Sequence, residues 1–305
     1  MTVDAPPPAT RRAMTEEPRP AGRVFLAPET PQPQRRAVAE RLMADHPELL
    51  AKAEDAIGLL RSIHLPASLR WAFLNNGKAG TSSARRFLFQ LEFGVPLTVD
   101  WDVPHDINPD GAVHNLQGGA GIFRPAIALP TPLAVLDGSL RLATVRHPIS
   151  RAISAFEYLC KSHDLRHSWF VQDRLRMNAV LGFDWTVDTR SPRGFLKFLD
   201  YIAWMQAEVG RFDINPHWRP QIDNVVPAIF RPQIVGRLED MGAFYREVAD
   251  QLGQALPPGF DVPAANRQSY AGDRSAWLTP EARDRITRLY AADLDWLGYD
   301  PGRPA

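Results

Sequence analysis

The chain alternates between short, continuous apolar runs and longer stretches in which apolar residues recur every three or four positions. Three short segments, at 71–74, 140–147 and 233–237, have the length of core β-strands, and the first is continuously apolar. The longer stretches around them have the spacing of helices. Strands that alternate with helices favour parallel, right-handed crossovers. The pattern therefore predicts an α/β fold in three layers, with a central parallel sheet flanked by helices.

Start signals and apolar spacing predict where the helices lie. Pro47 interrupts the first helical stretch and suggests that a second helix begins beside it. Two segments, 93–135 and 161–193, lack a clear period and are rich in polar residues. Because long irregular segments inside compact domains are usually functional, we expect these two to recognise a substrate. The helical stretches are 36–63, the residues after 83, those after Pro148, 194–210, 238–252 and 279–297.

The N-terminal residues have a different composition from the rest. Residues 1–35 contain eight of the 28 prolines, with only a small apolar cluster. Such a segment buries too little apolar surface to offset the entropy lost on ordering. We therefore expect a disordered tail over 1–35 and a single domain over 36–305.

Overall composition narrows the functional class. Hydrophobic residues make up 45% of the chain, and 35 basic residues balance 35 acidic ones. A net charge of zero argues against binding polyanions through bulk charge. The single cysteine, Cys160, excludes an intrachain disulfide. No stretch is apolar enough for a membrane span or a signal peptide, so a cytoplasmic location is expected.

The most informative segment is 71–90, which has the pattern of a strand, a tight loop and a helix. Gly77 and Gly80 permit a close turn in which backbone N–H groups converge. Hydroxyl side chains follow at the helix start, and Lys78 adds one cation. This combination favours an anion such as phosphate or sulfate, although an ordinary capped turn has the same residues. The hydroxyls belong to Thr81, Ser82 and Ser83.

A second cation is expected at the same edge of the sheet. Arg146 lies where the strand 140–147 ends, and Ser154 follows two turns into the next helix. Ligands of open α/β sheets bind beyond the carboxyl ends of the strands. Arg146 should therefore lie beside Lys78, unless it only caps the strand.

Two histidines and an aspartate in the segment 93–135 raise the question of a metal. His105, His114 and Asp102 fit no helix-borne ligand spacing, and no thiolate accompanies them. No metal site is therefore predicted.

Several motifs together resemble sulfotransferases that use 3′-phosphoadenylyl sulfate (PAPS), of the carbohydrate type (sulfotransferase family 2-like). Gly77-Lys78-Ala79-Gly80-Thr81-Ser82-Ser83 is similar to the family's 5′-phosphosulfate loop. Val145-Arg146-His147-Pro148 through Ser154 is similar to its 3′-phosphate signature. Three later segments continue the resemblance in order: His217-Trp218-Arg219-Pro220-Gln221, Gly236-Arg237-Leu238-Glu239-Asp240, and 289–299. The resemblance covers roughly residues 70–300 and implies a P-loop-like fold.

The resemblance implies roles for individual residues. Lys78 would stabilise the leaving oxygen, with no metal required, and 77–83 would hold the 5′-phosphate of PAPS. Arg146 and Ser154 would grip the 3′-phosphate, helped by Arg267 and Ser269 in a late segment. A general base is expected in the segment after the first helix of the motif. His114 is the first choice, His105 the second and Asp102 the third. His217 and Arg219 are expected to brace the cleft.

Two departures from the family pattern limit what is carried over. Gly77 replaces the usual proline before the loop lysine, and a proline-rich tail replaces the membrane anchor of Golgi members. We therefore expect a bacterial enzyme that sulfates a hydroxyl of a saccharide or another small molecule, without nucleic acid or a membrane span. The rivals are a nucleotide-dependent kinase on the same scaffold and a non-catalytic nucleotide-binding protein. Lys78 precedes Gly80, unlike the lysine of a Walker A loop, which argues against the kinase.

Overall fold

The computed structural model describes residues 31–99, 111–117, 121–260 and 274–302. Within them the fold is α/β, as predicted, with a five-stranded sheet in the order β3-β1-β2-β4-β5. The strands are β1 (Ile63–Leu65), β2 (Trp71–Leu74), β3 (Arg124–Pro125), β4 (Leu140–Val145) and β5 (Ile234–Arg237).

The sheet is mixed, so the prediction of a wholly parallel sheet was wrong for one strand, β1. β2, β4 and β5 are parallel, as expected, but β1 pairs antiparallel with both β2 and β3. Only five residues, 66–70, connect β1 to β2, which is too short for the crossover that a parallel pair requires. The sequence analysis did not predict β1, because its three residues directly follow a helix and continue the apolar pattern of that helix.

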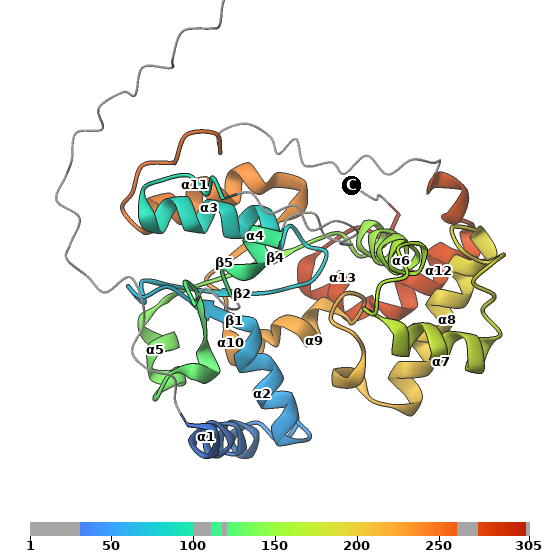
Figure 1. The fold of residues 1–305 in the computed structure, drawn as a ribbon, viewed down its shortest axis with the longest axis horizontal. Helices are drawn as coiled ribbons and strands as arrows, with labels where there is room; N and C mark the ends of the chain where they lie inside the picture. Colours follow the sequence, from blue (N-terminus) through green and yellow to red (C-terminus); the bar gives the residue numbers. More distant parts are fainter. Residues whose placement is uncertain (1–30, 100–110, 118–120, 261–273, 303–305) are drawn as a thin grey trace, which may run out of the picture.

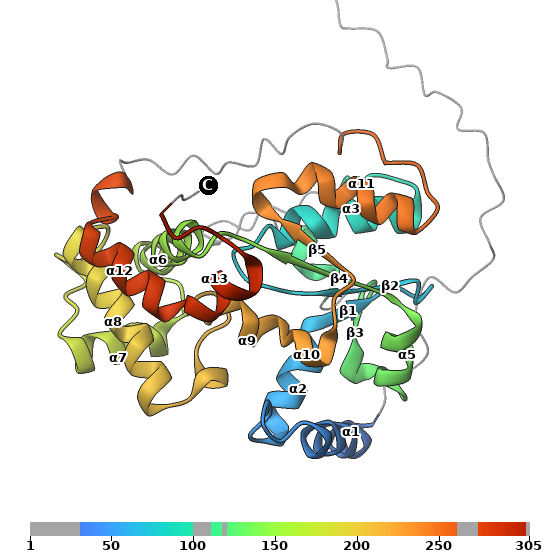
Figure 2. The ribbon, with the colours of Figure 1, turned by 180° about the vertical axis from the view of Figure 1, so that it is seen from behind.

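Helices cover both faces of the sheet, giving the three layers expected (Figures 1 and 2). Side chains of β2 alternate between the faces. Trp71 and Phe73 pack on one side, and Ala72 and Leu74 on the other. One face carries α3 (Thr81–Phe93), α4 (Gly111–Asn115) and α11 (Met241–Gln251). The other carries α1 (Gln32–Asp45), α2 (Ala53–Ser62), α5 (Pro132–Gly138), α9 (Gln221–Val225) and α10 (Pro227–Phe230).

A group of helices packs beyond one end of the sheet, around a separate aromatic core (Figure 1). It comprises α6 (Pro148–Asp164), α7 (Val171–Leu181), α8 (Pro192–Glu208) and α12 (Pro280–Leu289), and α13 (Ala291–Leu297) joins α12 to α9 beside it. The segment 161–193 is therefore more regular than predicted, because α6 extends into it and α7 lies within it. α7 has a weak pattern: it buries only Met177 and Asp173 and exposes Leu175.

Other boundaries also differ from expectation. α1 begins at Gln32, inside the range assigned to the tail, whereas 1–30 lie outside the described residues. The segment 93–135 contains α4, β3, α5 and the 3₁₀ helix η1 (Ala126–Ala128). The last predicted helix is divided at Tyr290 into α12 and α13. Further 3₁₀ helices are η2 (Arg211–Asp213), η3 (Leu238–Asp240) and η4 (Arg274–Trp277).

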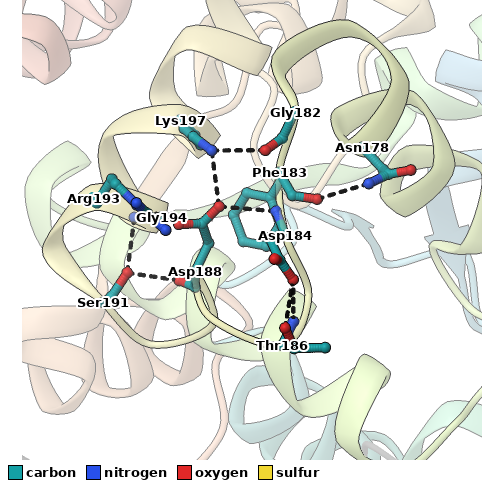
Figure 3. Close-up of polar contacts among 10 residues, drawn as sticks. All are labelled: Asn178, Gly182, Phe183, Asp184, Thr186, Asp188, Ser191, Arg193, Gly194 and Lys197. Carbon is teal, nitrogen blue, oxygen red and sulfur yellow. Dashed lines mark hydrogen bonds and ion pairs between the residues drawn. The ribbon is translucent and has the colours of Figure 1, made fainter.

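One buried carboxylate organises the connection between α7 and α8 (Figure 3). The side chain of Asp188 is fully buried and accepts from Arg193 Nε at 2.6 Å and Lys197 Nζ at 2.9 Å. Ser191 caps α8 by accepting from the Gly194 N–H. A Cβ on Gly194 would lie 1.8 Å from the Asp188 carbonyl oxygen, so only glycine fits there. We call Asp188, Arg193 and Lys197 the Asp188 cluster.

Candidate functional site

The loop between β2 and α3 has an unusual backbone. Lys78 and Gly80 both have positive φ angles, of 65° and 80°. Gly80 precedes α3, and no side chain caps this helix start. The positive φ of Gly80 favours glycine, and a Cβ there would lie 2.8 Å from Leu238 Cδ1, so the leucine side chain would have to shift. The loop therefore presents the N-terminus of a 13-residue helix, which attracts anions.

Hydrogen bonds from buried side chains fix the loop between β2 and α3. The Asn76 side chain is fully buried. Its Nδ2 donates to the Thr144 carbonyl oxygen at 3.0 Å and to Gln221 Oε1 at 3.1 Å. The Thr81 hydroxyl donates to the Asn76 carbonyl oxygen at 2.8 Å, so it braces the loop from within. Ser83 hydrogen-bonds Tyr245 on α11. The hydroxyls of Thr81 and Ser83 thus have different hydrogen-bond partners, although the sequence pattern predicted the same role for both.

Lys78 lies among other cations. Its Nζ is 3.8 Å from the centroid of the Tyr158 ring on α6. Burial, followed by repulsion from Arg146, Lys161 and Arg151, lowers the pKa of Lys78 to about 7, despite the opposing attraction of Glu157. The charged form of Lys78 is thus disfavoured in the folded protein, and the charge of a bound anion would favour it again. Such a cluster favours a ligand with several negative charges.

The end of β4 brings Arg146 to the same edge of the sheet. β2 and β4 pair in parallel, with Leu74 opposite Ala143, so Lys78 and Arg146 follow neighbouring strand ends. Arg146 Nε donates to Ser150 Oγ at 3.0 Å. Ser154 lies two turns into α6 and is buried. The structure therefore places these residues where the sequence predicted.

The backbone of Arg146 is fixed by a side chain that sequence reasoning did not single out. Gln221 Oε1 accepts from the Arg146 N–H at 2.9 Å, and Gln221 Nε2 donates to the Arg146 carbonyl oxygen at 2.8 Å. Asp293 then accepts from the main-chain N–H groups of Gln221 and Ile222, each at 2.8 Å. Gln221 therefore links the ends of β2 and β4, since it also bonds Asn76.

Arg151 is a second residue that the sequence did not reveal. It is 1% exposed and uses its whole guanidinium on backbone oxygens. These belong to Gly77 at 2.9 Å, Arg219 at 2.7 Å and Pro216 at 2.8 Å. Arg151 thus ties the loop to the segment 215–220. A Cβ on Gly77 would lie 3.1 Å from the Pro216 carbonyl oxygen, so this close approach explains the glycine.

The chemistry of these groups, polar and cationic at two parallel strand ends, agrees with the similarity to known proteins. A model described as "Sulfotransferase family" matches residues 131–300, more than half of the 305-residue chain. The chain belongs to the sulfotransferase family. No curated protein and no solved structure matches it. The matched range includes Arg146, Ser154 and Gln221, whereas Lys78 and its loop precede it.

Two motifs inside the range matched to the sulfotransferase family, those containing Glu239 and Tyr290, stabilise the backbone around the site through hydrogen bonds. Glu239 accepts from the His147 N–H and from the Tyr299 hydroxyl, both at 2.8 Å. Tyr290 donates to the Trp218 carbonyl oxygen at 2.8 Å. These contacts join β4, β5 and the C-terminal helices. Gln221 and Asp293 lie within two of the late motifs, so membership of those motifs is the sequence signal that could have indicated them.

Only one of the predicted bases, and neither residue of the late phosphate-binding segment, lies among the described residues. His114 lies on α4, with Nδ1 3.2 Å from Arg85 Nη1. His105, Asp102, Arg267 and Ser269 lie outside the described residues. Among the residues that the structure does describe, no group of three or more His, Cys, Asp or Glu side chains is arranged to hold a metal ion. None of the helices in those described ranges has the length and apolar character needed to cross a membrane.

Proposed function

We propose that this sulfotransferase-family chain transfers a sulfuryl group from PAPS to a hydroxyl, releasing 3′-phosphoadenosine 5′-phosphate (PAP). The observation that carries the proposal is the junction of two parallel strand ends. One ends in the Lys78 loop and the N-terminus of α3, and the other in Arg146 and the start of α6. PAPS has anionic groups at two positions, which suits two cationic sites beside each other.

Each part of the site has a chemical role in this proposal. The N–H groups and hydroxyls of 77–83 bind the 5′-phosphate, and Lys78 stabilises the charge that develops on the bridging oxygen as the S–O bond breaks. Arg146 and Ser154 bind the 3′-phosphate, with Arg267 and Ser269 assigned to help them. Protein cations supply the stabilising charge, so the proposal requires no metal.

The acceptor is proposed to be a saccharide hydroxyl or a hydroxyl of another small molecule. This assignment rests on the resemblance of the motifs to carbohydrate-type sulfotransferases. His114 and His105 are its predicted bases, because a neutral imidazole can take a hydroxyl proton near pH 7.

Calorimetry with PAP, ADP and ATP tests the donor assignment. We expect PAP to bind at least about tenfold more tightly than ADP, because each charge-assisted hydrogen bond to the 3′-phosphate contributes about 1.5–3 kcal/mol. A preference for ATP would instead support the kinase. PAP binding without sulfate transfer to any member of a saccharide and alcohol panel would support a non-catalytic nucleotide-binding protein.

A further inference from the structure

His217 lies beside the proposed reaction centre and shares an aromatic neighbour with Lys78. The His217 ring packs 5.3 Å from the ring of Tyr158 and 5.2 Å from that of Phe170, measured between centroids. Lys78 Nζ lies over the same Tyr158 ring, at 3.8 Å. The segment that carries His217 is held against the loop by Arg151, which bonds the carbonyl oxygens of both Gly77 and Pro216.

The orientation of the imidazole is fixed from one side. His217 Nδ1 lies 2.8 Å from Asn215 Oδ1, which also accepts from the His217 main-chain N–H at 3.1 Å. Asn215 Nδ2 donates to Asp173 Oδ2 at 3.4 Å, and the Tyr201 hydroxyl donates to Asp173 Oδ1 at 2.7 Å. Because an amide oxygen only accepts, Nδ1 must carry the proton of the neutral ring. Nε2 then keeps its lone pair.

One carbon of the His217 ring lies against the loop. A Cβ on Gly77 would lie 3.4 Å from His217 Cδ2, the carbon bonded to Nε2. None of the hydrogen bonds between described residues involves Nε2 of His217. Nε2 is therefore bonded to the ring atom nearest the loop, and its ring shares the Tyr158 ring with Lys78.

His114 has the opposite tautomer. The guanidinium of Arg85 is a donor only, so the 3.2 Å contact requires His114 Nδ1 to accept. The proton of a neutral His114 ring then resides on Nε2. In that state His114 can donate a hydrogen bond from Nε2, whereas His217 can accept a proton there.

We propose that His217 is the general base that removes the acceptor's hydroxyl proton, and that Asn215 and Asp173 position it. This inference rests on the proposed function and assigns to His217 the role first predicted for His114. As the acceptor oxygen bonds to sulfur and the S–O bond to the 5′-phosphate breaks, the hydroxyl proton moves to His217 Nε2. PAP departs with the bridging electron pair beside Lys78, and the imidazolium releases its proton to solvent.

The surrounding charges keep this base neutral before the donor binds. Burial and the positive charges of Lys78 on the loop and Arg151 on α6, together with His114 on α4, lower the pKa of His217 to about 3. Asp173 is the acidic group in its hydrogen-bond chain. The phosphates of a bound donor would offset the charge of Lys78 and raise the pKa towards the range in which an imidazole is an effective base.

Release of PAP from PAPS tests the proposal, with water or a member of a saccharide panel as the acceptor. His217→Ala should lower kcat by about 10²- to 10⁴-fold, the usual contribution of a general base, and change the Kd of PAP by less than about threefold. His46→Ala, at the C-terminus of α1, is the matched control and should match wild type. If wild type binds PAP but turns over no PAPS, the proposed function fails. If wild type is active and His217→Ala keeps its kcat, the base assignment fails.

Chemical rescue tests whether His217 removes a proton or only supports the structure of the site. Added imidazoles should restore PAP release by His217→Ala, with rates that rise as the pKa of the added base rises. His114→Ala should keep the wild-type dependence of kcat on pH on its acid side, whereas His217→Ala should lose it. Absence of rescue in a His217→Ala protein that still binds PAP, or loss of the acid dependence in His114→Ala alone, would overturn the assignment.

Discussion

Two networks of buried polar side chains in this protein differ in how far along the chain their members lie. The Asp188 cluster joins residues at most nine positions apart and forms a corner between two helices (Figure 3). The network around Gln221 joins residues at least 68 positions apart, including Asn76, Arg146 and Asp293. The first fixes local backbone. The second fixes the distance between two strand ends.

The Asp188 cluster and the site around Lys78 also differ in whether the protein favours the charged form of the buried group. Burial alone would raise the pKa of Asp188, but hydrogen bonds from Lys197, the Asp184 N–H and Arg193 outweigh it and lower the pKa. Its charge is thus compensated within the protein. Lys78 instead has a pKa lowered to about 7, with other cations among the causes. A carboxylate held in its charged form contributes to stability, whereas a lysine whose charged form is disfavoured can gain from the charge of a bound anion. Variants of the two networks should therefore affect different measurements.

Two lysine substitutions should give the largest contrast. Lys78→Ala should reduce kcat for PAPS by about 10²- to 10³-fold, because its charge acts mainly on the developing leaving-group oxygen. Its PAP affinity should fall much less. Lys197→Ala is the matched control in the Asp188 cluster and should keep the wild-type kcat. Equal rates for Lys78→Ala and wild type would remove Lys78 from the mechanism.

Asp188→Asn should affect stability rather than ligand binding. Removing a buried charge with two cationic partners should lower the free energy of unfolding by about 2 kcal/mol, and the melting temperature by several degrees. The Kd of PAP should stay unchanged. Because the folded-state pKa of Asp188 is lowered, its contribution is present above about pH 4 and is lost as pH falls through the folded-state pKa. Unfolding followed between pH 3 and pH 7 should therefore show the difference from wild type narrowing in acid; a constant difference would exclude the ionised carboxylate as its cause.

Gln221→Ala should affect both measurements, because its side chain supports the site through a buried network. Loss of its bonds leaves the Arg146 N–H and carbonyl groups without these partners, at a cost of about 1–3 kcal/mol in stability. The displaced Arg146 should also weaken PAP binding by about tenfold. Thermal unfolding and calorimetry on one preparation check both effects. An unchanged PAP affinity with reduced stability would show that Gln221 does not position Arg146.

Proton uptake should give the smallest effect. With a pKa of about 7, Lys78 is mostly neutral at pH 8 without ligand. Bound PAP should raise that pKa, so binding at pH 8 should take up about half to one proton per site. Calorimetry in two buffers of different ionisation enthalpy measures the uptake. Lys78→Met should abolish it, and an equal uptake by this variant would assign the proton to another group.

Sequence reasoning succeeded where a local pattern determines the structure. The loop 77–83 and the position of Arg146 followed from glycines, hydroxyls and strand ends. It did less well where structure depends on distant partners. β1 is only three residues long, and α7 has a weak apolar pattern. Nothing local marks Arg151 as the residue that bonds Gly77, 74 positions away.

The histidines show the same limit at the site. Order along the chain favoured His114 as the base and suggested a bracing role for His217. Only the contacts of the two Nδ1 atoms distinguish their tautomers, and neither Arg85 nor Asn215 could be assigned to them from spacing. The sequence therefore predicted that a histidine is the general base, whereas the contacts in the structure favour His217 over His114 for that role.

The central claim is that two neighbouring strand ends bind the two anionic ends of one nucleotide. It is tested most directly by calorimetry of wild type and Arg146→Ala with PAP and with adenosine 5′-phosphosulfate, which lacks the 3′-phosphate. Arg146→Ala should weaken PAP binding by about 10- to 100-fold, the value of a lost charged hydrogen-bond pair, and leave adenosine 5′-phosphosulfate binding nearly unchanged. Equal losses for the two ligands would contradict the account.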